Sequence, residues 1–346
     1  MTVQFAIEPL DQAAMVAARA HLDRLTKPPG SLGRLERLVE QLAGITGSAS
    51  PRIERPAVVV FAADHGVTAQ GVSAYPSAVT AQMVANFVDG GAAINVLARA
   101  AGAKLVVIDV GVAGPEAAAP SRIRPGTRDM TVEPAMTGDE ALAAIGVGRD
   151  VARGLVGDGC DAIALGEMGI GNTTAASALV AALTSRPPAQ VTGRGTGLDD
   201  EAVHHKVAVI EIALRRHRPT ADDPLGALAT VGGLEIAALV GAMLAAAEAR
   251  VPVVLDGFIT GAAALVAVAV APNLAPRLIA SHRSAEPGHR VVLERLALEP
   301  LLDLDLRLGE GSGAALALPL IRAAIELVAE MATFDSAGVS GRSEAR

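Results

Sequence analysis

One carboxylate of this sequence stands in a glycine loop at the start of an apolar run. Glu310 lies between Gly309 and Gly311 in LRLGEGSGAALALPL, and the residues that follow are typical of a buried helix. Glycine lets a backbone turn tightly or approach a ligand closely, and a buried carboxylate costs free energy unless something uses it. Glu310 is therefore a candidate acid or base, although a solvated loop glutamate is the simpler interpretation of the local sequence alone.

A second candidate is the glycine-rich segment ALGEMGIGNTTAASALVAAL. Its three glycines stand between an expected strand and an expected helix whose first residues are Asn172, Thr173 and Thr174. Free backbone N–H groups and the positive end of the helix dipole make such a helix start a phosphate site. The segment lacks the Gly-Lys-Ser/Thr of a Walker loop, and Thr174 replaces the third glycine of GxGxxG. A plain glycine turn with Asn172 or Thr173 as N-cap stays open.

Two weaker signals accompany these segments. The loop GRGTG, residues 193–197, precedes an expected helix that carries Lys206, but most such glycine loops are turns. Glu167 could act with Glu310 as the acid and base pair of a carboxylate-based hydrolase.

The histidines have no established metal spacing. His65 follows an aspartate, residues 204 and 205 are adjacent histidines, and His282 and His289 stand seven residues apart. Adjacent histidines on one helix point in different directions, and neither DHG nor SHRSAEPGH matches a known metal motif. We expect no metal site, and we favour a structural role for His65 and His289.

The elements that must position these residues follow one recurring pattern. Five short apolar runs, rich in β-branched residues, each end in polar residues and lead into a stretch with helical spacing. Strands that alternate with helices build parallel sheets, and continuous apolar runs indicate strands buried on both faces. Ligands bind such sheets beyond the carboxyl ends of the strands. The polar residues at these ends are Asp64 and His65, Asp109, Glu167, Asp256, and Ser281 and His282.

Both ends of the chain are predicted to be helical. Residues 31–46 place leucines on one helical face, and the last 60 residues are mostly helical in pattern. We expect an α/β domain over residues 55–284 and a small helical subdomain built from residues 1–54 and 285–346. The polar tail after Phe334 is expected to fray.

Composition excludes several classes of protein. The 346 residues carry a net charge of −8, with no Trp and one Tyr, so the basic patches and stacking platforms of nucleic-acid binding are missing. A single cysteine, Cys160, excludes an intramolecular disulfide, and the first residues lack the pattern of a secretory signal. The apolar run 257–272 is shorter than a membrane span, and we interpret it as a buried helix. We expect a cytoplasmic protein that binds no nucleic acid and no membrane.

Six segments occur together in one order along the chain. They are KPPGSLGRLE (27–36), AADHGV (62–67), GEMGIGNTTAA (166–176), LDGFITGAAAL (255–265), SHRSAEPGH (281–289) and RLGEGSGAALALP (307–319). Together they resemble the nicotinate-nucleotide:dimethylbenzimidazole phosphoribosyltransferase family of cobalamin biosynthesis, from about residue 20 to 335. The resemblance implies a Rossmann-like three-layer α/β domain with a small domain from both chain ends, a homodimer, and a reaction that needs no cofactor or metal.

The resemblance also implies the chemistry. The 5-phosphoribosyl group passes from nicotinate mononucleotide to 5,6-dimethylbenzimidazole, giving α-ribazole 5′-phosphate and nicotinate. Glu310 matches the family's base, which takes the proton that the attacking benzimidazole loses. Because nicotinate leaves from a nitrogen that is already positively charged, the reaction needs no acid. A partly desolvated carboxylate has a raised pKa, which suits a base near neutrality.

The remaining site residues are carried over by the same motifs. The phosphoribosyl and nicotinate site is expected to contain Glu167, Gly169, Asn172, Thr173, Thr174, Gly195, Lys206 and Asp256. The flat base is expected to contact Tyr75, Met83, Met168 and Leu308. Two alternatives stay open at this stage: a non-catalytic homologue that binds a nucleotide or a base, and a nucleotide N-glycoside hydrolase.

Overall fold

A five-stranded parallel sheet forms the centre of the molecule. The computed structural model describes residues 6–114 and 119–340. The strands follow the order β2-β1-β3-β4-β5, and every neighbouring pair is parallel. Their bounds are β1 Pro56–Ala63, β2 Lys104–Gly111, β3 Ala162–Met168, β4 Val253–Leu255 and β5 Leu278–Ala280. Each of the five predicted runs forms one strand, which confirms the predicted α/β class.

Helices cover both faces of the sheet. Along β1, Val59 and Phe61 point into one apolar cluster and Val58 and Val60 into another, as the two-residue period of a strand requires. All of β1 is buried, but most of β2 is only half-buried. The prediction of strands buried on both faces is therefore wrong for β2, because it lies at the edge of the sheet.

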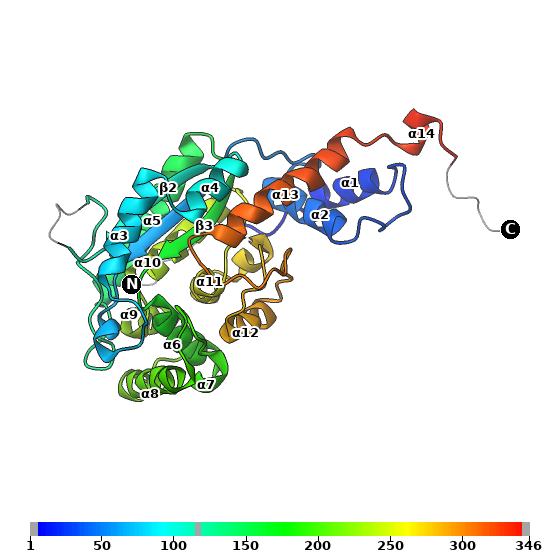
Figure 1. Ribbon diagram of the computed structural model, residues 1–346. Coiled ribbons are helices and arrows are strands. Elements are labelled where there is room, and N and C mark those ends of the chain that lie inside the picture. The colour runs from blue at the N-terminus through cyan, green and yellow to red at the C-terminus, as the bar shows by residue number, and fades with distance from the viewer. Residues whose placement is uncertain (1–5, 115–118, 341–346) are drawn as a thin grey trace.

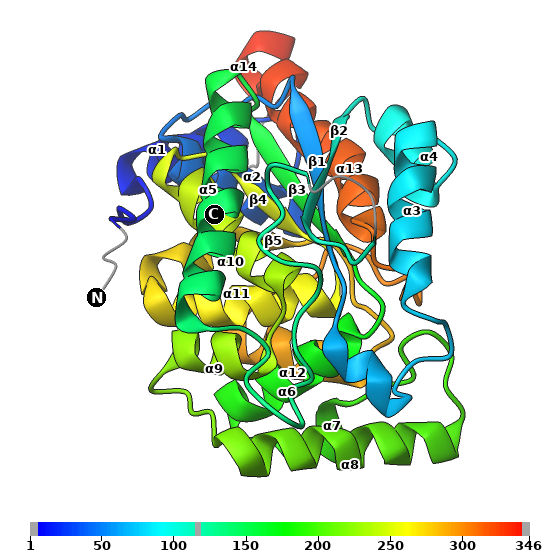
Figure 2. The same ribbon diagram turned by 90° about the vertical axis from the view of Figure 1, so that its left-hand side faces the viewer.

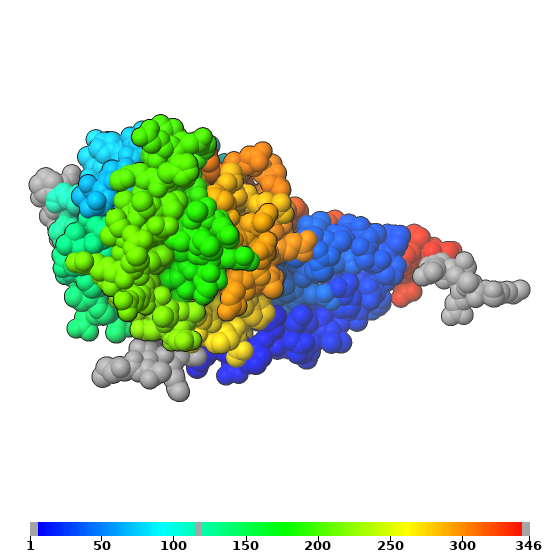
Figure 3. All heavy atoms as spheres, turned by 90° about the horizontal axis from the view of Figure 1, so that it is seen from below, coloured from blue at the N-terminus to red at the C-terminus, as the bar shows by residue number. Residues whose placement is uncertain are grey.

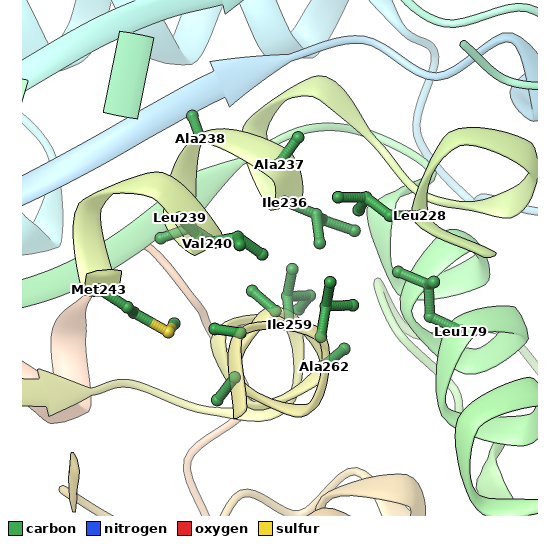
Figure 4. Packing of buried hydrophobic residues seen from close by; sticks show 14 of the residues in the cluster. Leu179, Leu228, Ile236, Ala237, Ala238, Leu239, Val240, Met243, Ile259 and Ala262 are labelled. Carbon is green, nitrogen blue, oxygen red and sulfur yellow. The ribbon is translucent and has the colours of Figure 1, made fainter. Parts of the chain in front are cut away.

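One face of the sheet is covered by α5 (Gly138–Gly157), α10 (Leu234–Glu248) and α11 (Phe258–Val270) (Figure 2). α10 and α11 are buried along almost their whole lengths, and their side chains interlock with Leu179 and Leu228 of neighbouring helices (Figure 4). The run 257–272 thus forms the buried helix that its composition predicted. α5 and α10 touch through their backbones: a Cβ at Gly148 would lie 1.8 Å from the carbonyl oxygen of Ala238.

The other face is covered by α3 (Ala78–Asp89), α4 (Ala93–Ala100) and α13 (Ser312–Glu330). α13 begins over the sheet and runs outward to α1 (Gln12–Leu22) and α2 (Arg34–Thr46) (Figure 1). The first and last helices therefore lie together at one end of the molecule (Figure 3). The predicted limits of a small subdomain stay a prediction. Within them, α12 (Pro287–Leu296) packs against α11, α6 (Asn172–Thr184) and α7 (Pro188–Val191).

The remaining elements are short or lie at the periphery. They are α6 Asn172–Thr184, α7 Pro188–Val191, α8 Asp200–His217, α9 Pro224–Val231, α14 Phe334–Ala337 and the 3₁₀ turns Gly66–Gln70 and Pro272–Arg277. The tail after Phe334 begins within α14, whose first turn is capped by Thr333, and its fraying stays a prediction. Residues 341–346 of that tail lie outside the described residues.

α13 is the one helix of the described residues that is long and apolar enough to cross a membrane. More than half of it is buried inside the fold, including the apolar side chains that face β1, β3 and β4. A core helix has the same length and composition, so this feature is weak evidence for a membrane span.

Candidate active site

The Glu310 loop lies directly on the carboxyl end of β3. The Glu310 N–H donates to the carbonyl oxygen of Glu167 at 3.3 Å. A Cβ at Gly166 would lie 2.5 Å from the carbonyl carbon and oxygen of Glu310. Only glycine at this position of the strand lets the loop come so close.

The loop is held in an unusual backbone conformation. Gly309, Glu310 and Gly311 have φ values of 83°, 65° and 86°, so three consecutive residues are left-handed. This region costs a residue other than glycine roughly 1 kcal/mol or more. Contacts that surround the loop must therefore hold Glu310 there.

Asp256, at the end of β4, supplies several of those contacts. Its Oδ1 accepts from the N–H groups of Gly313 at 2.7 Å and Ala314 at 3.1 Å, and its Oδ2 accepts from Gly311 at 3.3 Å. Asp256 is fully buried and caps the first turn of α13. Its carboxylate therefore orients the Glu310 loop, and its predicted contact with substrate stays a prediction.

Glu310 itself has the environment that a base needs. Its side chain is 6% exposed, and its Oε2 accepts from the Ile94 N–H at 3.4 Å. Burial raises the pKa of Glu310 above its ordinary value, and the Ile94 N–H opposes this only in part. The Ile94 contact could not be predicted from sequence, because a backbone donor at the start of α4 leaves no signal in residue types.

Two further buried acids lie at the same edge of the sheet. Burial raises the pKa of Glu167 well above its ordinary value, and the charges of Asp256 and Glu235 add to the effect. Burial also raises the pKa of Asp256 to about 7, against the three N–H groups that it accepts and with help from Glu310. Glu167 also accepts a short hydrogen bond from the Asn172 side chain. Three buried acids this close together disfavour one another's ionisation, which adds to the effect of burial on the pKa of Glu167.

The first turn of α6 provides a site for an anion. The N-cap of α6 is Gly171, so the interpretation of Asn172 or Thr173 as N-cap is wrong. No side chain caps this end of the helix, and the buried Thr174 hydroxyl has no partner among the described residues. The N–H groups of Asn172 and Thr174 donate to the carbonyl oxygens of Gly169 and Gly171, so the helix dipole and the Thr174 hydroxyl are what favour a phosphate here.

Lys206 adds a buried positive charge beside that turn. Its side chain is fully buried, and its Nζ donates to the Thr173 hydroxyl at 2.7 Å. The loop at Gly195 lies against both groups, because a Cβ there would be 2.9 Å from Thr173 Oγ1 and 3.2 Å from Lys206 Nζ. Burial lowers the pKa of Lys206 to about 8, and the negative charge of Glu286 opposes this shift.

The four residues predicted to contact the base differ in their exposure. Met83 and Met168 are half-buried and pack against the apolar cluster between the sheet and α13. Tyr75 and Leu308 are more than half exposed. Large apolar side chains exposed at a site suit a flat ligand, but the contact of these four residues with a base stays a prediction.

The histidines tie loops together. His65 Nε2 lies 2.6 Å from Glu235 Oε1, and His289 Nδ1 accepts from the Ser284 N–H at 2.9 Å. Burial lowers the pKa of His289 to about 3 and that of His282 to about 4, so both rings are neutral at neutral pH. These contacts agree with the structural role that we favoured. Glu235 was missed from the sequence, because it stands 170 residues from His65.

Two clefts lie beside this site. A cleft of about 430 Å³ is lined by α7, α12 and the segment before α12, and one of about 390 Å³ by the Gly195 loop, α8 and Arg307. They share residues 285–287. Within the described residues, no group of three or more His, Cys, Asp or Glu side chains is placed to hold a metal ion.

Comparisons with known proteins agree with this geometry. A family model described as a phosphoribosyltransferase matches residues 7–339. The nicotinate-nucleotide–dimethylbenzimidazole phosphoribosyltransferase of Roseiflexus sp. (strain RS-1) is 57% identical over 342 residues, which cover 98% of this chain and 97% of the relative. The enzyme of the same name from Halalkalibacterium halodurans is 53% identical, with 98% and 96% covered. The crystal structure of CobT from Thermus thermophilus superposes with a TM-score of 0.91 at 51% identity, covering 95% of this chain and 99% of that one.

Proposed function

The chain belongs to this phosphoribosyltransferase family, and from that membership we propose that it transfers the 5-phosphoribosyl group from nicotinate mononucleotide to 5,6-dimethylbenzimidazole. The products are α-ribazole 5′-phosphate and nicotinate, so the reaction belongs to cobalamin biosynthesis. The observation that carries the proposal is the position of the buried Glu310 loop on β3, at the edge of the sheet that also holds the anion site of α6.

One bond breaks and one forms at C1′ of the ribose. The bond from C1′ to the pyridinium nitrogen of nicotinate breaks, and its electron pair neutralises the positive charge on that nitrogen. One ring nitrogen of the benzimidazole forms the new bond, and attack from the opposite face inverts the β-linkage to α. The proton on the second ring nitrogen goes to the Glu310 carboxylate, whose raised pKa matches this task.

The phosphate of the nucleotide belongs at the first turn of α6. Thr173 and Thr174 offer hydroxyl groups and Lys206 an ammonium there, and the Gly195 loop lies against Thr173 and Lys206. The Glu167 side chain, which bonds Asn172 at the same turn, lies where it can contact a ribose hydroxyl. The donors of this cradle and a base at Glu310 fit a transfer reaction with a cationic leaving group.

The same membership leads us to propose a homodimer in the cytoplasm, with the flat base lying between Tyr75, Met83, Met168 and Leu308. The exposure of Tyr75 and Leu308 supports a base site near the surface, one that a second subunit could cover. Size-exclusion chromatography with light scattering tests the dimer directly.

A product assay tests the function against its two alternatives. The purified protein is incubated with nicotinate mononucleotide, with and without dimethylbenzimidazole, and nicotinate and α-ribazole 5′-phosphate are measured by chromatography. We expect nicotinate to form only when the base is present, in equal amounts with the second product. Nicotinate release at the same rate without the base would identify a hydrolase, and no turnover would identify a binding protein.

The pKa of Lys206 predicts the alkaline limit of activity. The Lys206 ammonium is present below its pKa of about 8 and is lost above it, so kcat/KM for nicotinate mononucleotide should fall as the pH rises through this value. Lys206→Arg should lower activity but remove this alkaline limb, because a guanidinium stays charged. Rates measured across neutral and alkaline pH test this, and a limb that persists unchanged in Lys206→Arg would assign it to another group.

A further inference from the structure

A buried carboxylate lies beside the anion site, where it would repel a phosphate. Glu286, the N-cap of α12, is 6% exposed. Its Oε1 accepts from the Gly195 N–H at 2.9 Å, and its Oε2 is buried without a partner among the described residues. A Cβ at Gly193 would lie 2.1 Å from Oε2, so the carboxylate rests directly on the backbone of the 193–197 loop.

An unused carboxylate in this position is costly. Burial without full hydrogen bonding disfavours a charged group by several kcal/mol. Phosphate sites are normally lined by donors and positive charges. A buried carboxylate here must therefore stabilise some other group, and it must do so in the free enzyme, before the substrate binds.

The Lys206 ammonium supplies that reason. It is fully buried and has three N–H donors, of which Thr173 Oγ1 takes one. It has no direct ion pair in the described part of the chain. An isolated buried ammonium tends to lose its proton, and a neutral Lys206 would bind a phosphate poorly.

Glu286 is the acid that faces Lys206. Thr173 approaches Lys206 from α6, Gly195 from the loop, and Glu286 from the end of α12, whereas α7 and α9 carry no titratable side chain. The two arginines near this loop bond other groups. Arg194 bonds Asp200 and the Leu198 carbonyl, and Arg307 bonds the Gly195 carbonyl oxygen.

We propose that Glu286 is a positioning residue, which holds the 193–197 loop against Thr173 and balances the charge of the Lys206 ammonium before the nucleotide binds. This inference rests on the proposed function, since it concerns the phosphate site of the nucleotide substrate. One contact serves both purposes, holding the loop and balancing the charge. The Gly195 N–H donates to Glu286, and Gly195 also lies against Lys206. When a phosphate binds, its negative charge replaces that of Glu286 in balancing the Lys206 ammonium.

The test compares pH profiles of kcat/KM for nicotinate mononucleotide in the full-length enzyme. Glu286→Gln keeps an oxygen that can accept from the Gly195 N–H but removes the negative charge. We expect its alkaline limb to move to lower pH by about one unit, with kcat/KM on the acid side of that limb equal to that of the wild type or higher. Glu294→Gln is the matched control, because Glu294 is exposed on the same helix and pairs with Arg290.

A second variant separates the charge balance from the positioning of the loop. It also tests the proposal if urea unfolding shows that Glu286→Gln does not fold. Glu286→Asp keeps the charge but is too short to reach the Gly195 N–H. The alkaline fall of its kcat/KM should occur at the same pH as in the wild type, while KM for the nucleotide rises about tenfold. An unchanged KM would overturn the inference.

The outcomes are distinguishable from failure of the proposed function. An inactive wild type would refute that function. An active wild type whose alkaline limb coincides with that of Glu286→Gln, or shifts equally in Glu294→Gln, would overturn only the role of Glu286.

Discussion

Replacing Glu310 by Gln should lower kcat by about 10³-fold while leaving KM for nicotinate mononucleotide within about twofold, because a lost general base affects the transition state and not ground-state binding. Glutamine has nearly the same shape and can still accept from the Ile94 N–H. The loop therefore keeps its position, and only the ability to take the benzimidazole proton is lost. Steady-state kinetics with both substrates varied measure this effect.

Glu330→Gln is the matched control, because Glu330 is exposed at the far end of the same helix, α13. Its kinetics should equal those of the wild type. A Glu310→Gln enzyme that retained more than a tenth of wild-type kcat would show that another group, or bulk water, takes the proton.

The second large effect should come from Gly166→Ala, a change that alters no polar group. The new methyl would lie 2.5 Å from the carbonyl group of Glu310 and from the nitrogen of Gly311, well inside contact distance. These are backbone atoms, so the loop has to lift off β3 and take the Glu310 carboxylate with it. A displacement of about 1 Å at a reacting group costs on the order of 10²-fold in rate, and we expect kcat to fall by this factor.

Gly154→Ala controls for the added methyl group. Gly154 lies on α5, and nothing comes within 4 Å of a Cβ placed there. That variant should fold and react normally, with equal or slightly higher stability because alanine favours helix. Wild-type kcat in Gly166→Ala would mean that the loop does not need its close contact with β3 for catalysis.

The sheet and its active edge could be predicted from sequence because both depend on local patterns. An apolar run followed by a polar residue marks a buried strand and its carboxyl end, and Glu167 and Asp256 lie where this rule places them. The rule does not say what a side chain contacts. Asp256 was predicted to touch substrate, yet its oxygens accept N–H groups from Gly311 and the start of α13, 55 and more residues further along the chain.

The function depended on a resemblance, because the local sequence of Glu310 is compatible with a solvated loop. The contacts of Glu286 could not be predicted even with this resemblance. Its motif, SHRSAEPGH, was among the six segments, but its partner Gly195 lies 91 residues away. An unpartnered carboxylate oxygen is a property of the packed structure and not of residue types. The partial exposure of β2 was missed for the same reason, since strand order depends on long-range pairing.

The position of α13 also determines when the enzyme can become active during synthesis. His21 bonds the carbonyl oxygen of Val328 across 307 residues, and Leu25 pairs with Thr333. Contacts of such separation form late in folding, since closing a long loop costs entropy before it gains stabilisation. The apolar residues of α2 that pack against α13 therefore stay uncovered until the C-terminal helix leaves the ribosome, and the same helix brings Glu310 to β3. A nascent chain that ends before Glu310 would have the anion site but no base, so catalysis begins only when translation is nearly complete.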